Sequence, residues 1–229
     1  MTTMPSTTTL RRLLAALGLL LASAAAPAAN ASLEEVMSYD GLQKIRVEGI
    51  DLAYARPGAK LSTYHRVIID PVEVAFSKSW NPKVPGRVLP LSEADRERIR
   101  SGVAQIVQEE FVRELQSNSG YQVVTAAAPD VLRVKAHIAN LYVNAPDTNA
   151  TAVRTYVITA GEMTLVAELY DSETGQVEAR LVDRREARAT SRLQLTGAMQ
   201  NADEARTIAA AWARILRKSM DRAHGVGGK

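Results

Sequence analysis

The stretch GEMTLVAELYDSETGQVEARLVDRREAR, residues 161–188, decides the fold that the sequence predicts. Apolar and polar residues alternate in two runs, and between them DSETGQ supplies the acidic, hydroxyl and glycine residues that favour a chain reversal. The pattern therefore predicts a β-hairpin. We expect one face to be apolar and covered, with Met163, Leu165, Ala167, Leu169, Val177, Ala179 and Leu181. The other face carries side chains that can pair across the strands: Glu162, Thr164, Glu168, Glu178, Arg180, Arg184, Glu186 and Arg188.

Other elements of the predicted fold lie on both sides of the hairpin. A strand over 66–76 is rich in β-branched residues, and Pro71 marks an edge position or a bulge within it. A helix begins at Ser92 with a capping-box pattern and stops at Gly120. After a short extended piece at 121–125, three further segments follow in chain order: a long strand, a possible short strand and a final amphipathic helix, at 130–143, 154–158 and 202–223.

The order of these elements predicts an α/β fold of the α+β type. A strand joined through a helix to the next strand implies a parallel crossover, and the hairpin then adds antiparallel strands. We expect a two-layer sandwich in which two amphipathic helices pack on one face of a mixed sheet. Since the first, middle and last strands would run the same way, three loops would emerge at one sheet end: 77–91, 144–160 and 189–201.

The amino-terminal segment has the pattern of a secretory leader. Two arginines, Arg11 and Arg12, precede the apolar run Leu13–Ala22 and a series of small residues. The run is shorter than the roughly 18–20 residues that cross a bilayer, so we expect cleavage and no transmembrane span in the mature chain. An uncleaved anchor is the alternative. The predicted organisation is a signal peptide, an irregular lead-in, a single α/β domain and a flexible tail, at 1–31, 32–64, 65–224 and 225–229.

Composition excludes several classes of protein. The chain of 229 residues has a formal net charge of +3, and without the two leader arginines it carries 26 basic against 25 acidic residues. Bulk charge therefore does not support nucleic-acid binding. The chain has no cysteine, which excludes disulfides, thiolate nucleophiles and cysteine metal sites.

The sequence predicts neither a cofactor nor a catalytic centre. Its three histidines, His65, His137 and His224, have no metal-ligand spacing, and we expect no metal. The chain has no glycine-rich phosphate loop, no nucleophile elbow and no carboxylate pair that stands out from the charges of the hairpin. A non-catalytic protein is therefore expected.

One aromatic residue marks a candidate partner-binding surface. Trp80 lies beside proline and lysine in SWNPK, residues 79–83. It can be an exposed anchor for a protein or for cell-wall or lipid material, or a lid folded on the core, and both alternatives stay open. With the neighbouring loop residues that the topology would bring close, the candidate surface comprises Trp80, Lys83, Arg87, Tyr142, Arg154 and Tyr156.

Several segments resemble the bacterial lipoprotein family catalogued as domain of unknown function 3313. They include YDGL (39–42), ARPGAKLSTYHRV (55–67), DPVEVAF (70–76), LSEAD (91–95), GYQVV (120–124), PDVLRV (129–134), GEMTLVAELYDSETG (161–175) and RLVDRREAR (180–188). The resemblance implies an envelope protein of a Gram-negative bacterium and carries no activity or catalytic residues. Lipid attachment needs a cysteine at the cleavage site, which this chain does not have, so we expect a periplasmic or secreted form.

The sequence thus favours a non-catalytic periplasmic binding or accessory protein whose partner is a protein or another envelope component. Two alternatives remain: a hydrolase-like envelope enzyme without a recognisable motif, and a structural protein that self-associates through the strand broken by Pro71. The sequence predicts no particular oligomeric state.

Overall fold

The structure is a computed structural model that describes residues 33–80, 92–144, 159–186 and 198–226. The chain divides into two compact units, Met1–Val36 and Met37–Lys229. Residues 33–36 of the first unit are described, and they begin the short helix α1 (Leu33–Ser38). The signal peptide expected over 1–31 lies outside the described residues, and the remainder of this section concerns the second unit.

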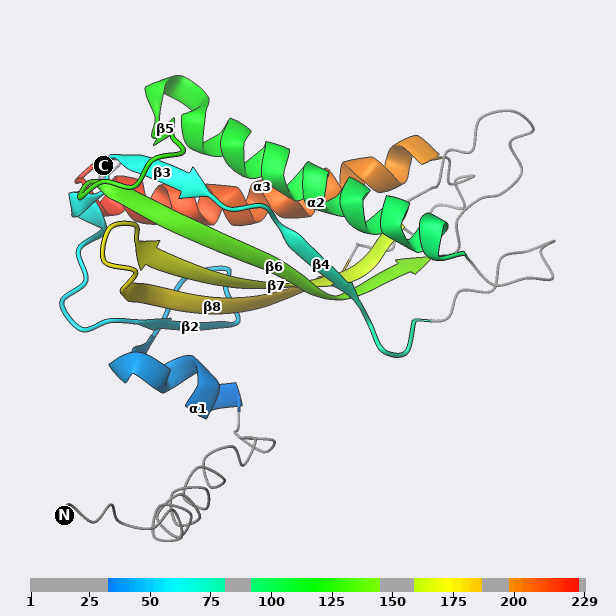
Figure 1. The fold of residues 1–229 in the computed structure, drawn as a ribbon, viewed down its shortest axis with the longest axis horizontal. Coiled ribbons are helices and arrows are strands. Elements are labelled where there is room, and N and C mark those ends of the chain that lie inside the picture. The colour runs from blue at the N-terminus through cyan, green and yellow to red at the C-terminus, as the bar shows by residue number, and fades with distance from the viewer. Residues whose placement is uncertain (1–32, 81–91, 145–158, 187–197, 227–229) are drawn as a thin grey trace, which may run out of the picture. The chain divides into compact units, whose positions relative to one another are not determined.

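In the described part of that unit, a mixed sheet of eight strands is the central element (Figure 1). Its order is β1-β2-β8-β7-β6-β3-β5, and β4 pairs with β6 beside this path. Parallel pairing joins β3 to β5 and to β6, and β4 to β6, whereas the other pairs are antiparallel. The strands are β1 (Gln43–Ile45), β2 (Leu52–Ala55), β3 (Arg66–Ile69), β4 (Glu73–Phe76), β5 (Gln122–Val123), β6 (Val131–Asn144), β7 (Thr159–Asp171) and β8 (Val177–Glu186).

Two long helices, α2 (Glu93–Gln116) and α3 (Ala198–Ala223), pack on the same face of the sheet (Figure 1). Three short 3₁₀ turns connect other elements: η1 (Tyr39–Gly41), η2 (Leu61–Thr63) and η3 (Ser117–Ser119). The inward residues of the strands and helices form one core, which includes Ile99, Val103, Leu132, Ile138, Met163, Leu165, Trp212 and Met220. The two-layer α+β prediction is confirmed.

The predicted strand directions are also confirmed. β4 runs parallel to β6, and two successive antiparallel pairings bring β8 back to the same direction. The carboxyl ends of β4, β6 and β8 therefore point to one end of the sheet. The loops expected there lie almost entirely outside the described residues, as does the possible strand at 154–158.

Helix α2 begins as its sequence predicts. The Ser92 hydroxyl accepts a hydrogen bond from the Asp95 amide, and the Asp95 carboxylate accepts one from the Ser92 amide, each at 3.2 Å. This capping box satisfies two of the amide groups that have no partner within the helix. The helix ends at Gln116, and Gly120 follows the turn η3.

The hairpin is confirmed, with corrections at Glu178 and Val177. Glu178 was predicted on the face where charges pair across the strands, but it is the bulged residue of β8 and is buried. The Asp171 carboxylate accepts hydrogen bonds from the Glu173 and Thr174 amides and so forms the predicted turn. A bulge between the pairs Leu169–Ala179 and Tyr170–Val177 adds one residue to β8. Val177 was predicted on the face covered by helices, but the bulge turns it to the opposite face, because an extra residue reverses the alternation. There it packs in a second cluster with Met37, Leu42 and Tyr54.

Two predictions for the first part of the domain need correction. The segment 32–64 is not an irregular lead-in, because it contains α1, β1, β2 and η2 and extends the sheet beside β8. The strand expected over 66–76 is two strands, β3 and β4, separated at Asp70-Pro71, where proline has no amide to donate. Within the described residues, no helix is both long and apolar enough to span a membrane.

Candidate apolar binding site

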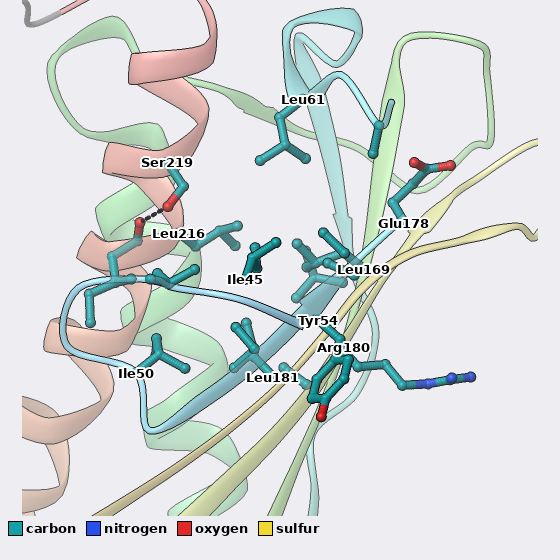
Figure 2. Close-up of a pocket in the computed structure, with 18 of the residues that line it drawn as sticks. Ile45, Ile50, Tyr54, Leu61, Leu169, Glu178, Arg180, Leu181, Leu216 and Ser219 are labelled. Carbon is teal, nitrogen blue, oxygen red and sulfur yellow. Dashed lines mark hydrogen bonds between the residues drawn. The ribbon is translucent and has the colours of Figure 1, made fainter. Parts of the chain in front are cut away.

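A cavity of about 460 Å³ lies between α3 and the part of the sheet formed by β2, β8 and β7. We call it the α3 pocket. Figure 2 shows Ile50, Leu181 and Leu216 directed toward its centre. Its aliphatic lining includes Ile45, Val47, Ile50, Leu61, Leu169, Leu181, Ile215 and Leu216.

Small residues on the inward face of the sheet explain why a space is left under α3. Ala55 on β2 lies opposite Ala179 on β8, and Ala179 lies opposite Leu169 on β7. Ala53 and Ala167 line the same cavity. Because an alanine methyl group reaches less far than a leucine or valine side chain, α3 packs on this half of the sheet without filling it.

One wall of the pocket is the connection between β1 and β2, residues 46–51, and β8 holds it in place. Arg185 Nη2 donates to the Gly49 carbonyl at 2.9 Å, and the Arg184 amide donates to the Asp51 carboxylate at 2.9 Å. Gly49 has a φ of +79°, and a Cβ atom there would lie 3.1 Å from Ile215 Cδ1. The connection therefore passes close to α3, where only glycine combines this backbone conformation with the small available space.

Asp183 is the polar centre of this attachment. Its carboxylate is 3% exposed and accepts hydrogen bonds from Trp212 Nε1 at 2.6 Å, Arg185 Nε at 2.8 Å and the Asp51 amide at 3.1 Å. A buried carboxylate with three donors is well satisfied. The wall, β8 and α3 are therefore linked through one side chain.

Two polar residues of the lining, Ser219 and Arg180, are engaged elsewhere. The Ser219 hydroxyl donates to the Ile215 carbonyl within α3 at 2.9 Å. Arg180 points away from the pocket centre (Figure 2), and it pairs with Glu168 and Asp40, each at 2.7 Å. The centre of the α3 pocket is accordingly apolar.

The charged end of the pocket contains Arg56, Lys60 and Glu178. Glu178 is the residue added by the bulge in β8, and it is 7% exposed. Burial raises the pKa of the Glu178 carboxyl above its usual value, while the charges of Arg56 and Asp171 act in opposite directions on this pKa. Figure 2 shows the carboxyl directed away from the aliphatic centre.

Trp80, an aromatic residue of the predicted partner surface, is buried in the structure. Trp80 is 4% exposed, its indole N–H donates to the Val143 carbonyl at 2.7 Å, and its ring stacks on Phe76 at 4.1 Å. Of the two alternatives, Trp80 takes the folded-lid arrangement and is not an exposed anchor, because the core supplies both a stacking partner and an acceptor.

Only part of that predicted surface can be located. Tyr142 is 41% exposed on β6, one residue before the acceptor of the Trp80 indole. The other four residues, Lys83, Arg87, Arg154 and Tyr156, lie outside the described residues. The structure brings Trp80 and Tyr142 to the same end of β6.

Sequence reasoning missed the α3 pocket. The alternating residues of the hairpin identified the sheet face that lines the pocket. The wall, residues 46–51, belongs to the segment that was expected to be irregular. The available signal was the combination of small residues at the inward positions of β2, β7 and β8 with Ile45, Val47 and Ile50 upstream. Among the described residues, no group of three or more histidine, aspartate or glutamate side chains could hold a metal ion.

Fold and site together define a class: a mixed α+β domain with two helices on one sheet face and an apolar pocket under the second helix. The chain belongs to the family described as protein of unknown function DUF3313, whose model matches residues 32–216. The family resemblance seen in the sequence is thereby confirmed.

The solved structures that the chain matches have low sequence identity to it. Protein XCC0632 from Xanthomonas campestris is 12% identical, with 74% of this chain and 93% of that chain covered, and the TM-score is 0.41. The PelC dodecamer from Paraburkholderia phytofirmans is 9% identical, with 77% and 96% covered and a TM-score of 0.32. Protein CT253 from Chlamydia trachomatis is 12% identical, with 69% and 95% covered and a TM-score of 0.34. No curated protein sequence matches the chain.

Proposed function

We propose that the protein is a non-catalytic binding protein of the cell envelope, periplasmic or secreted, that takes an aliphatic chain of a small ligand into the α3 pocket. The observation that carries the proposal is the apolar cavity of about 460 Å³. Its volume lies within the roughly 300–1,000 Å³ typical of small-molecule sites.

The lining supports an aliphatic ligand in preference to water. A water molecule needs two to four polar partners, and an apolar cavity stays dry and binds apolar molecules. Each methylene group moved from water to such a site contributes about 0.8 kcal/mol. Asp183 and Arg185 hold residues 46–51, the wall of the pocket, close to α3. This position of the wall favours a ligand with a thin chain.

The sequence supports the location and the absence of catalysis. Met1–Ala31 has the pattern of a secretory leader, and the family resemblance implies an envelope protein. Ser219 and Arg180, two polar residues of the lining, are bonded to a helix carbonyl and to carboxylates outside the lining, and Arg180 points away from the pocket centre.

A pocket-filling variant tests the proposal. We expect the full chain to bind the neutral apolar dye Nile red with a saturable rise in fluorescence. Ala179→Phe places a phenyl ring between β8 and α3 and should weaken this binding by about tenfold or more, which corresponds to only about 1.4 kcal/mol of lost contact. Ala55→Leu is a milder variant on the facing strand.

The matched control is Ala127→Phe, which adds the same ring at an exposed position that does not line the pocket. Circular dichroism should show that all variants keep the secondary structure of the parent. Equal dye affinity in Ala179→Phe, Ala55→Leu and the control, or no dye binding by the parent chain, contradicts the proposed function.

A further inference from the structure

We infer that the ligand is a long-chain carboxylate, with its alkyl chain in the α3 pocket and its head group paired with the Lys60 ammonium. This inference rests on the proposed function and adds the chemistry of the head group. Lys60 precedes η2, lines the pocket and is exposed. In the described part of the chain, its ammonium group has no hydrogen bond and no ion pair.

The other charges that line the pocket are already engaged. Arg56 Nε donates to the Val177 carbonyl at 2.9 Å, and Arg56 Nη1 donates to the Asp40 carbonyl at 3.3 Å. Arg56 also attracts the Glu178 carboxyl, the one acidic group of the lining. Arg180 pairs with Glu168 and Asp40. Arg56 is thus held by two backbone carbonyls and Arg180 by two carboxylates, whereas Lys60 is the lining cation whose charged group has neither a hydrogen bond nor an ion pair among the described residues.

The side chain of Lys60 has both parts that an amphiphile requires. The four methylene groups of a lysine can extend an apolar wall while its ammonium stays in water. Leu61, the next residue, points into the pocket (Figure 2), and Ser62, an exposed residue, also lines it. A ligand with a buried chain and a hydrated anionic head would match this order of groups.

A carboxylate fits these groups better than a phosphate does. One ammonium and one hydroxyl match the single charge of a carboxylate, whereas phosphate sites usually combine several cations or a bidentate arginine. The rim is exposed, so the head group would contribute a small and salt-sensitive share of the affinity. The alkyl chain would contribute the rest.

Two ligands of equal chain length test this inference, ω-bromododecanoic acid and ω-bromododecanol. The chain contains two tryptophans, and Trp212 lines the pocket, so Trp80→Phe in the full chain leaves Trp212 as the reporter. Bromine quenches indole fluorescence at short range. In this background we expect the acid to bind about three- to fivefold more tightly than the alcohol at low salt, as an exposed ion pair allows.

Substitution of Lys60 separates charge from packing. Lys60→Met keeps an unbranched apolar stem and should make the two affinities equal by weakening only the acid, whereas Lys60→Arg should keep the preference for the acid. Equal affinities already in the parent, or an equal loss for both ligands in Lys60→Met, overturn the head-group inference and leave the proposed function intact. Absence of quenching by both ligands, with no Nile red binding, rejects the proposed function itself.

Discussion

Glu178 shows how one inserted residue changes the chemistry of the site. It occupies the bulge of β8, where it has no residue opposite it on β7. Its side chain is mostly buried, and burial raises the pKa of its carboxyl above the usual value of 4.5. The ionised form is therefore less favourable in the folded protein than in the unfolded chain.

The raised pKa of Glu178 determines whether the stability of the protein rises or falls with pH. A carboxyl whose pKa is higher in the folded state contributes stability below the unfolded-state pKa, and the contribution is lost as pH rises through the folded-state pKa. We expect Glu178→Gln to be more stable than the parent at pH 8, with a difference that shrinks toward pH 4. Urea unfolding at pH 8 and at pH 4 measures this difference in stability.

The control for this experiment is Glu186→Gln, whose side chain is 66% exposed. It should show no comparable pH-dependent difference. If Glu178→Gln were instead less stable than the parent at pH 8, the attraction between Glu178 and Arg56 would outweigh the cost of burying the carboxylate.

Whether Trp80 is exposed or buried could not be predicted from its neighbours in the sequence. Its neighbours in sequence suited both an exposed anchor and a folded lid. The outcome depends on the Val143 carbonyl, an acceptor 63 positions away, and on the stacking partner Phe76. Phe76 is only four residues from Trp80, but the Val143 acceptor comes from a distant strand, and local sequence does not show that this strand lies beside Trp80.

At the scale of elements, the end of α2 depends on a side chain from α3. Arg217 Nη1 donates to the Glu114 carbonyl at 2.9 Å and to the Leu115 carbonyl at 3.3 Å. These carbonyls belong to the last turn of α2, and besides Arg217 they accept from the Ser117 and Tyr121 amides that follow the helix. A Cβ atom on Gly120 would lie 2.2 Å from the Leu115 carbonyl oxygen, so only glycine fits at this position.

Loss of this contact should destabilise the fold. We expect Arg217→Met to lower the free energy of unfolding by about 1–3 kcal/mol, because carbonyls near the end of α2 lose a charged donor in a part-buried site. The matched control is Arg214→Met on the same helix, which removes a 52% exposed side chain and should change stability by no more than about 0.5 kcal/mol. Guanidinium unfolding distinguishes them, and equal effects would contradict the capping role.

Elements with long local patterns were predicted, and the short ones were missed. α2 has a capping box at its start, β6 alternates from Leu132 to Ile138, and the hairpin has a clear turn, so each is defined by its own residues. β1 and β2 have three and four residues; β2 pairs with β8, more than 100 positions later, and β1 pairs with β2. Tertiary pairing of this kind overrides weak local preference.

At the scale of the whole molecule, Asp183 joins three parts of the fold: the wall of the α3 pocket, β8 and α3. We expect Asp183→Ala to lower the free energy of unfolding by about 2–4 kcal/mol, since it leaves the Trp212 indole and the Arg185 guanidinium without their buried acceptor. Nile red binding should weaken in parallel, because the wall loses its attachment. Thermal unfolding and dye titration measure the two effects.

Asp203→Ala is the control, because that side chain is 70% exposed and lies at the start of α3. It should change stability by less than about 0.5 kcal/mol and leave dye binding unchanged. A stability loss in Asp183→Ala without any change in dye affinity would show that the wall does not need this attachment to form the pocket.

The α3 pocket is a property of the whole molecule, and for that reason the sequence did not predict it. The alternating residues predicted an apolar sheet face and two helices to cover it, and both are present. Whether the facing surfaces meet or leave a space depends on their separation, which is set by Trp212, Asp183 and the residues 46–51 together.

The strand lengths at the margins of the sheet have a consequence for behaviour in a crowded compartment. Among the described residues, the strands with one unpaired side are β1, β4 and β5, of three, four and two residues. An incoming polypeptide would find at most a few consecutive amide and carbonyl groups to bind, too few to nucleate a fibril-like ladder. The break at Asp70-Pro71 keeps β4 to four residues, whereas an unbroken strand over 66–76 would present a longer unpaired side.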